Sequence, residues 1–313
     1  MGKHRIKPNY RRRVLRLPDL DHCKLAVLNS LGSPASRRVY EYCGSSKRYE
    51  TGKSLLQFKP AVWEKGMIHQ LPTFAGDPDG VAQQINDDGK VVGGSGTCAA
   101  FNTNFLYNLV PVHALLWEKG KAIDLGNLGG QTGQAGGNIA YDINNQGQVV
   151  GNSDLKGDTT FHAFLWTKRT GMQDLGTLSG NVASTSISIN DAGSVIGASL
   201  DANFNPRTFL WEKGMMTDLN TLIAGDSPLY LLTGCSINSR GEITGLGLTS
   251  TGEIHTYLAT PAQGVATSES TSQGVISRRI LSDDARKVLG PIRSSSHHGA
   301  AIITGKIRIA SVV

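Results

Sequence analysis

The sequence predicts an all-β fold: a β-propeller of four to five four-stranded blades over residues 60–260, which need not form a complete ring, with a short helical N-terminal extension. Three observations support this. Glycine accounts for 38 of 313 residues, which is 12% against about 7% in average proteins, and only 18% of the residues are charged. All four tryptophans lie at one position of an internal repeat. Each repeat contains four short strand signals separated by turn residues.

The repeat opens with an apolar strand that ends in tryptophan. One copy has His113-Ala-Leu-Leu-Trp117, and the same block recurs at 162–166 and 207–211. A divergent copy begins at Ala61, and a fifth begins at His255 and stops at Leu258. The intervals between tryptophans are 54, 49 and 45 residues. Self-similarity at this period is typical of propellers. A β-sandwich stays open as an alternative, but it would not need the same signature at a fixed spacing.

Turn residues separate the strands within each copy. The block from Ile143 to Gly151, Ile-Asn-Asn-Gln-Gly-Gln-Val-Val-Gly, predicts a hairpin in which Gly147 supplies a positive φ. Trp-Glu-Lys-Gly at 117–120 predicts a second tight turn. Segments such as 163–166 are apolar on both faces, so we expect them to be covered on both sides. Sheets stacked face to face in this way are the blades of a propeller.

Charge divides the chain into three segments. Residues 1–60 hold 14 Lys and Arg against 4 Asp and Glu, residues 61–259 hold 10 against 18, and residues 260–313 hold 7 against 3. We therefore predict a basic helical extension over 1–59, the propeller over 60–260, and a linker-like tail over 261–313 with one short helix. No apolar run is long enough for a membrane span, so no membrane partner is expected. The cysteines at 23, 43, 98 and 235 form no Cys-x-x-Cys pair and predict no disulfide framework.

The repeat resembles a known family. His162-Ala-Phe-Leu-Trp166, then Asp174-Leu175-Gly176, then Ile189-Asn190-x-x-Gly193 are similar to the HAF-repeat family of probable extracellular repeat proteins, over about residues 60–260. The resemblance implies a secreted or envelope-associated bacterial repeat protein with no established activity. The first thirty residues show no apolar region typical of a signal peptide. A cytoplasmic location therefore stays open beside the extracellular or envelope location that the family implies.

The N-terminal segment has a different character. Pro18 and Gly32 are suited to bound one helix, and a second is expected from Ser33 through Tyr40. Residues 11–45 resemble the start of phage-integrase-type tyrosine recombinases, where such a segment begins a helical DNA-clamping domain. The Arg…His-x-x-Arg…Tyr constellation of that family is missing, so the resemblance implies no recombinase activity. The alternatives are DNA association through a basic cluster and a solvated remnant of a gene fusion. The cluster consists of Arg11, Arg12, Arg13 and Arg16.

Other candidate sites have simpler explanations. The Gly-rich run 126–137 lacks a Gly-Lys-Ser/Thr ending and is expected to be a loop between blades. The Asn/Asp turns predict no metal site, because Asn144-Asn145 fills the same slot without a carboxylate. His113, His162 and His255 share one repeat position with Arg207, and we interpret them as structural. We expect no enzyme, because no nucleophile or acid–base set can be assembled, and no cofactor.

One insertion breaks the repeat. Seventeen residues separate Ser95 from His113, where the equivalent gaps elsewhere are 7 or 8. Strand alternation places this insertion on the same face as the loops that connect successive blades. Loops on a rigid scaffold often bind partners, and aromatic rings beside amides suit recognition. The candidate binding residues are Phe101, Asn102, Asn104, Phe105 and Tyr107. The alternative is a looser strand that pads a divergent blade.

Two functions follow from these observations. The first is a non-enzymatic, extracellular-type repeat protein that binds a carbohydrate or protein partner through the long-loop face of the propeller. The second is a DNA-associated protein that acts through the basic N-terminal segment without recombinase catalysis. For the fold itself, we expect the strand that holds Trp63 to pair with the segment from Ile237 to Leu258 and close the ring.

Overall fold

The computed structural model describes residues 38–39, 59–100, 107–223, 227–261 and 307–312. Of 38–39, 98–100, 107–109 and 307–312 it describes only the backbone. Within these ranges the chain is all β apart from one 3-10 turn, η1 (Leu219–Thr221). The predicted helix that begins near Pro18, the predicted tail helix and the basic cluster at 11–16 lie outside the described residues.

Four consecutive sheets of four antiparallel strands form the body, and in each the strands follow one another in chain order. Blade 1 consists of β4 (Asp79–Ile85), β5 (Val91–Ala100), β6 (Tyr107–Glu118) and β7 (Lys121–Asp124). Blade 2 consists of β8 (Ile139–Ile143), β9 (Val149–Asp154), β10 (Phe161–Thr167) and β11 (Gly171–Asp174). Blade 3 consists of β12 (Ala183–Ile189), β13 (Val195–Leu200), β14 (Pro206–Glu212) and β15 (Met215–Asp218). Blade 4 consists of β16 (Leu229–Ile237), β17 (Ile243–Thr249), β18 (Ile254–Pro261) and β19 (Ile307–Val312).

A smaller sheet precedes blade 1. It contains β1 (Arg38–Val39), β2 (Ala61–Glu64) and β3 (Met67–Gln70), and we call it the opening sheet. Trp63 of β2 occupies the repeat position that Trp117 occupies in β6. The strands β2 and β3 therefore correspond to the third and fourth strands of a blade.

The predicted turns are confirmed by the backbone. Glycines of the Asn-x-x-Gly hairpins have positive φ, for example 75° at Gly147 and 84° at Gly193. In the Glu-Lys-Gly turns the lysine and the glycine both have positive φ, for example 51° at Lys119 and 75° at Gly120. Two consecutive positive φ values are typical of the type I′ turn, whose twist matches that of the flanking strands.

Burial decreases from the first strand of a blade to the last. Every residue of β8 and β12 is buried, whereas β11 has no buried residue. The first strands of successive blades also contact one another, β4 with β8, β8 with β12, and β12 with β16. The first strands are therefore innermost, which is the arrangement of a β-propeller. The fold predicted for residues 60–260 is confirmed.

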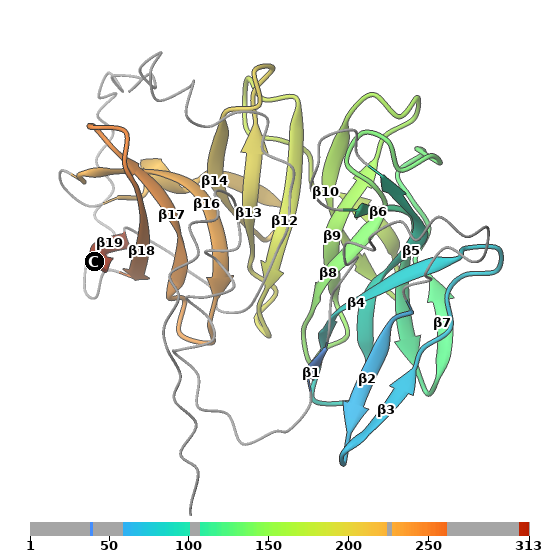
Figure 1. The fold of residues 1–313 in the computed structure, drawn as a ribbon. Coiled ribbons are helices and arrows are strands. Elements are labelled where there is room, and N and C mark those ends of the chain that lie inside the picture. Colours follow the sequence, from blue (N-terminus) through green and yellow to red (C-terminus); the bar gives the residue numbers. More distant parts are fainter. Residues whose placement is uncertain (1–37, 40–58, 101–106, 224–226, 262–306, 313) are drawn as a thin grey trace, which may run out of the picture.

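The blades form an open fan rather than a closed ring. Figure 1 shows the opening sheet at one end of the row of blades and blade 4 at the other. We expected the Trp63 strand to pair with the closing segment, and this is wrong. In the structure β2 pairs with β1 and β3, while β18 pairs with β17 and β19. The closing blade takes its fourth strand from the end of the chain, so its edge is already paired.

Two further expectations need correction. Residues 33–40 were expected to form a helix, but Arg38 and Val39 pair with Trp63 and Val62 as a short strand, since β2 otherwise lacks a neighbour on this edge. Cysteine spacing predicted no disulfide framework, but Cys235, buried in β16, is disulfide-bonded. The side chains of the other three cysteines lie outside the described residues. A bond between residues distant in sequence leaves no spacing signature.

Glycine ends the Val-Val-Gly block and the equivalent Val-Ile-Gly block at 195–197 for a steric reason. A Cβ on Gly151 would lie 1.9 Å from the carbonyl oxygen of Ile139, and one on Gly197 would lie 2.0 Å from that of Thr185. The carbonyls belong to the irregular first strands, where the register shifts by one residue. Only glycine leaves room for the backbone of the first strand at this point.

We therefore expect Gly151→Ala to lower the free energy of unfolding by about 2–3 kcal/mol, because β8 must move away from β9. Chemical denaturation monitored by tryptophan fluorescence measures this loss. Gly147→Asn is the matched control: its φ of 75° suits asparagine, and the nearest atom to an added Cβ is 3.8 Å away. A loss at Gly151 no larger than that at Gly147 would contradict the steric explanation.

Candidate functional site

The long loops of neighbouring blades meet on one face, which we call the loop face. The loop between β7 and β8 contacts the end of β9, where the Leu128 amide donates to Ser153 Oγ at 2.8 Å and the Gly130 amide donates to the Asp154 carbonyl at 3.0 Å. Loops between blades and loops inside a blade therefore lie side by side, as strand alternation predicted. The tight Asn-x-x-Gly and Glu-Lys-Gly turns lie at the opposite end of the strands.

A buried carboxylate organises the Gly-rich loop. Asp154 is fully buried, and its carboxylate accepts hydrogen bonds from the amides of Ala135, Gly136 and Gly137 at 3.1, 2.7 and 2.8 Å. The Asp154 carboxylate already accepts the hydrogen bonds from the backbone N–H groups that a phosphate would need. The interpretation of this run as an inter-blade loop rather than a phosphate site is consistent with these contacts.

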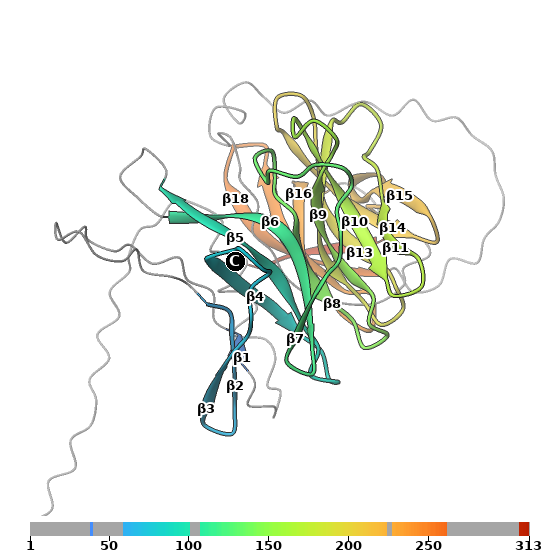
Figure 2. The same cartoon turned by 90° about the vertical axis from the view of Figure 1, so that its right-hand side faces the viewer.

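The predicted insertion lengthens one hairpin. Strands β5 and β6 stay paired as far as Ala100 and Tyr107, well beyond the ends of β9 and β10. Figure 2 shows this hairpin extending away from the other blades. Its base is fixed where the Asn138 amide donates to the Pro111 carbonyl at 2.8 Å.

Most of the predicted binding residues lie outside the described residues. This holds for Phe101, Asn102, Asn104 and Phe105. Tyr107 begins β6, and its side chain is not described. The exposure of these side chains stays a prediction.

A different aromatic residue is described on the loop face. Phe204 lies in the loop between β13 and β14, its side chain is 43% exposed, and its φ is 61°. Positive φ is uncommon for a bulky residue and is a strained conformation. Val182, which is 45% exposed, lies nearby, because its amide bonds to the carbonyl of Leu200 at the start of the same loop.

The carboxylate of Asp201 holds Phe204 in this conformation. It accepts hydrogen bonds from the amides of Asn203 and Asn205 at 2.8 and 2.9 Å and from Asn205 Nδ2 at 2.8 Å. The Phe204 amide donates to the Asp201 carbonyl at 2.9 Å. We call Asn181, Val182 and residues 201–205 the Phe204 patch. Sequence reasoning missed it, because its loop has an ordinary length and its ring lies at no repeat position.

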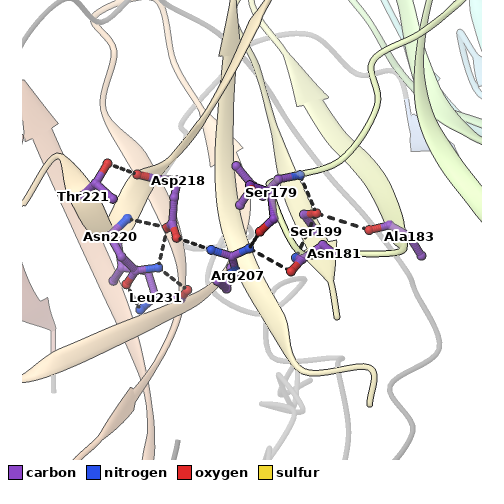
Figure 3. Close-up of polar contacts among 10 residues, drawn as sticks. Ser179, Asn181, Ala183, Ser199, Arg207, Asp218, Asn220, Thr221 and Leu231 are labelled. Atoms are coloured by element: carbon purple, nitrogen blue, oxygen red, sulfur yellow. Dashed lines mark hydrogen bonds and ion pairs between the residues drawn. The ribbon is translucent and has the colours of Figure 1, made fainter. Parts of the chain in front are cut away.

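Arg207 links the Phe204 patch to blade 4. It is the second residue of β14, the strand that follows the patch. Its guanidinium donates to Asp218 Oδ2 at 3.0 Å, to Asn181 Oδ1 at 2.8 Å and to the Ser179 carbonyl at 2.8 Å (Figure 3). Asn220, in the turn after Asp218, contacts both Asp218 and the backbone of Leu231. This network fixes the relative position of two loops and two blades, which fits the structural role predicted for this repeat position.

The histidines at this position also contact carboxylates. His113 Nδ1 lies 2.9 Å from Asp77 Oδ2, and His162 Nδ1 lies 2.9 Å from Asp174. Burial raises the pKa of Asp174, but the hydrogen bonds from His162 and the Gly176 amide outweigh this effect, so its pKa lies below the ordinary value.

A serine also bonds to the carboxylate of the Asp77–His113 pair. Ser95 Oγ donates to Asp77 at 2.5 Å, so Asp77 lies between Ser95 and His113. In a hydrolytic triad the histidine must contact the serine in order to take its proton. This arrangement has the residue types of a triad but not its order, and it provides no activated nucleophile.

The Asn/Asp turns form a ladder between blades. Asn86 Nδ2 donates to the Asn144 carbonyl at 3.0 Å, and Asn144 Nδ2 donates to the Asn190 carbonyl at 2.7 Å. Asn145 Nδ2 contacts Asp87 and Asp191 at 2.8 and 3.1 Å. The side-chain amide of Asn145 therefore already donates hydrogen bonds to the carboxylates that a cation would need as ligands. Within the described part of the chain, no group of three or more His, Cys, Asp or Glu side chains is placed to hold a metal ion.

Comparisons with known proteins give no family. No family model matches the chain, and no curated protein matches it. Among solved structures it is similar to the β-propeller domain of the Trilobed protease from Pyrococcus furiosus, which is described as having an open velcro topology (11% identity, TM-score 0.38). It is also similar to a triple arginine-to-alanine mutant of AofleA from Arthrobotrys oligospora (13% identity, TM-score 0.32). Each match covers 64% of this chain, and 55% and 60% of those chains respectively. Over the described residues, no helix has the length and hydropathy needed to cross a membrane.

Proposed function

We propose that this chain is a non-enzymatic binding scaffold that holds a carbohydrate or protein partner through the loop face. The observation that supports this most directly is Phe204, a partly exposed ring held at positive φ by the carboxylate of Asp201. Strain of this kind persists only where the surroundings impose it, and it is frequent at binding sites.

The surroundings of the ring suit recognition. Asn203 and Asn205 flank Phe204, and Asn181 and Val182 lie on the adjoining loop. A rigid aromatic surface provides contact area, while amides provide hydrogen bonds to hydroxyl groups or to a peptide backbone. The hairpin of β5 and β6 ends on the same face, and we propose that Phe101, Phe105 and Tyr107, which the sequence places in its insertion, extend the binding surface over blade 1.

The described disulfide supports an extracellular or envelope location. Disulfides persist in oxidising compartments and are rare in the cytosol, and Cys235 is disulfide-bonded. The absence of an activated nucleophile at the Ser95–Asp77–His113 cluster supports a non-enzymatic role at that cluster.

Replacement of Phe204 tests the proposal. The full chain is screened on an array of glycans and on an array of extracellular proteins, and dissociation constants are measured for the ligands it binds. Phe204→Asn keeps a residue that tolerates positive φ but removes the ring. We expect it to weaken binding about thirtyfold, as the loss of an aromatic anchor worth roughly 2 kcal/mol would do. Its melting temperature should be close to that of the parent.

Met215→Asn is the matched control, because Met215 is 68% exposed and lies at the opposite end of blade 3. It should bind like the parent. Replacement of Phe101, Phe105 and Tyr107 together by Ala tests the blade 1 part of the surface in the same assay. Binding that survives both Phe204→Asn and the triple replacement would refute the loop-face proposal. Salt-sensitive binding of duplex DNA that depends on Arg11, Arg12, Arg13 and Arg16 would instead favour the alternative function.

A further inference from the structure

Blade 4 has two apolar faces, and one of them packs on blade 3. In β17, Ile243 belongs to an apolar cluster that includes Ile196 of blade 3. Side chains alternate between the two faces of a strand, so Leu246 and Leu248 lie on the opposite side of β17. We call the side that holds these two leucines the outer face of blade 4.

The outer face is buried, although the described clusters on it contain residues of blade 4 alone. Leu248 packs with Leu232 of β16, and Leu246 packs with Cys235 of the same strand. The exposed fractions of these four side chains lie between 3% and 8%. A sheet face with no layer above it would leave its leucines in contact with water. Another part of the molecule therefore covers this face.

The disulfide at Cys235 indicates which part of the molecule this is. The chain has three other cysteines, Cys23, Cys43 and Cys98. Cys98 belongs to β5 of blade 1, where it pairs with Leu109. The Cα atoms of two bonded cysteines lie within about 7 Å of each other, whereas blades 2 and 3 separate blade 1 from blade 4 (Figure 1). Cys98 is therefore too distant, and two candidates remain.

Both remaining cysteines belong to a segment that also reaches the other end of the fan. Cys23 precedes β1 and Cys43 follows it, and β1 pairs with β2 in the opening sheet. The charge of this segment is opposite to that of the blades. Residues 1–60 hold 14 Lys and Arg against 4 Asp and Glu, which is +10, whereas residues 61–259 hold 10 against 18, which is −8. Opposite net charges favour contact between the two.

We propose that Cys235 is bonded to Cys23 or Cys43, and that this bond fastens the N-terminal segment, residues 1–58, over the outer face of blade 4. The segment covers the leucines of that face. Because β1 of the same segment is paired in the opening sheet, the bond links the two ends of the open fan covalently, without strand pairing between them. The link lasts only in an oxidising compartment, since reduction separates the two sulfur atoms.

Peptide mapping of the full chain under non-reducing conditions tests the assignment. Trypsin cleaves after lysine and arginine, which places the four cysteines in four different peptides, 17–24, 39–47, 91–119 and 214–240. Peptide 214–240 should be found joined to 17–24 or to 39–47, and reduction should release both partners. A free thiol in peptide 214–240 would overturn the proposal, and so would a bond from it to 91–119 or to a second copy of itself.

Cys235→Ser tests what the bond does for the outer face. Release of the segment should expose the leucines, so we expect the variant to raise the fluorescence of an apolar dye such as ANS at least about threefold over the parent. Cys98→Ser is the matched control, because it leaves the bond at Cys235 in place and should give the fluorescence of the parent. Circular dichroism checks that both variants fold, and dye binding by the parent before and after reduction gives a second measurement. Equal fluorescence of parent and Cys235→Ser would show that the face is covered without the bond and would overturn the role proposed for it.

Discussion

Asp154→Ala is expected to lower the free energy of unfolding by at least about 3 kcal/mol, because it leaves three buried or half-buried backbone amides without an acceptor. The amides of Ala135, Gly136 and Gly137 all point at this carboxylate. No other described side chain bonds to these three amides. For a domain with a total stability of 5–15 kcal/mol, this is a large fraction.

Loss of the Asp154 carboxylate should also destabilise the base of the long hairpin formed by β5 and β6. Gly133 and Gly137 pack against Pro111 of β6, and the Asn138 amide bonds to the carbonyl of the same proline. When the loop 126–138 loses its anchor, the hairpin loses its support on this side. Hydrogen exchange should therefore show faster exchange in residues 107–112 as well as in the loop.

Asp158→Gly is the matched control, because the φ of 52° at Asp158 would strain an alanine there. Asp158 is also an aspartate beside this loop, and its carboxylate accepts from the amides of Gln131 and Thr132 at 2.8 and 3.2 Å. These amides belong to exposed residues, so water can replace the carboxylate, and we expect a loss below about 1 kcal/mol. Denaturant unfolding of both variants measures the difference. Equal losses would show that burial of the amides is not what makes Asp154 important.

The blades were predictable because the same pattern of strand and turn residues recurs in successive repeats of the sequence. The tryptophan block, the Asn-x-x-Gly turn and the Glu-Lys-Gly turn each recur, and a local rule such as positive φ at Gly147 acts in the same way in every copy. Ring closure was not predictable in this way. It depends on which strand pairs with β18, and β19 comes from a part of the chain that carries no repeat signature.

The Phe204 patch shows a second limit. The aromatic insertion at 99–112 could be predicted as a candidate binding segment because its length differs from that of the equivalent segments. The loop 201–205 has an ordinary length, and the feature that distinguishes it is the backbone conformation at Phe204. An Asp-x-Asn-x-Asn sequence before Pro206 does favour a turn built on the aspartate carboxylate. That signal predicts the turn, but not that the ring at its centre is exposed.

A second large effect is expected from a carboxylate in the innermost strand of blade 2. Asp142 is buried in β8, at the point where the register with β9 shifts. Its oxygens accept from the amides of Ile143 and Ile189 at 2.8 and 2.9 Å and from Ser188 Oγ at 3.2 Å. Burial raises its pKa from 3.8 to about 7, and the hydrogen bonds only partly oppose that effect.

This shift should make stability fall as pH rises from about 4 to 7. Below pH 3.8 Asp142 is protonated in both the folded and the unfolded chain and contributes no pH dependence. Between 3.8 and 7 the unfolded chain has lost the proton while the folded chain keeps it, so unfolding releases a proton and becomes more favourable as pH rises. Above about 7 both are ionised and the loss is complete, on the order of 4 kcal/mol.

Asp142→Ser tests this expectation, because serine occupies the corresponding position in blades 3 and 4, at Ser188 and Ser236. The free energy of unfolding is measured for the parent and the variant by urea denaturation at intervals from pH 4 to pH 8. The contributions of titratable groups that the parent and the variant share cancel in the difference between the two free energies of unfolding. Relative to the parent, the variant should gain about 4 kcal/mol over this range. A difference for Asp142→Ser that does not change with pH would show that this carboxyl is ionised in the folded protein throughout the range.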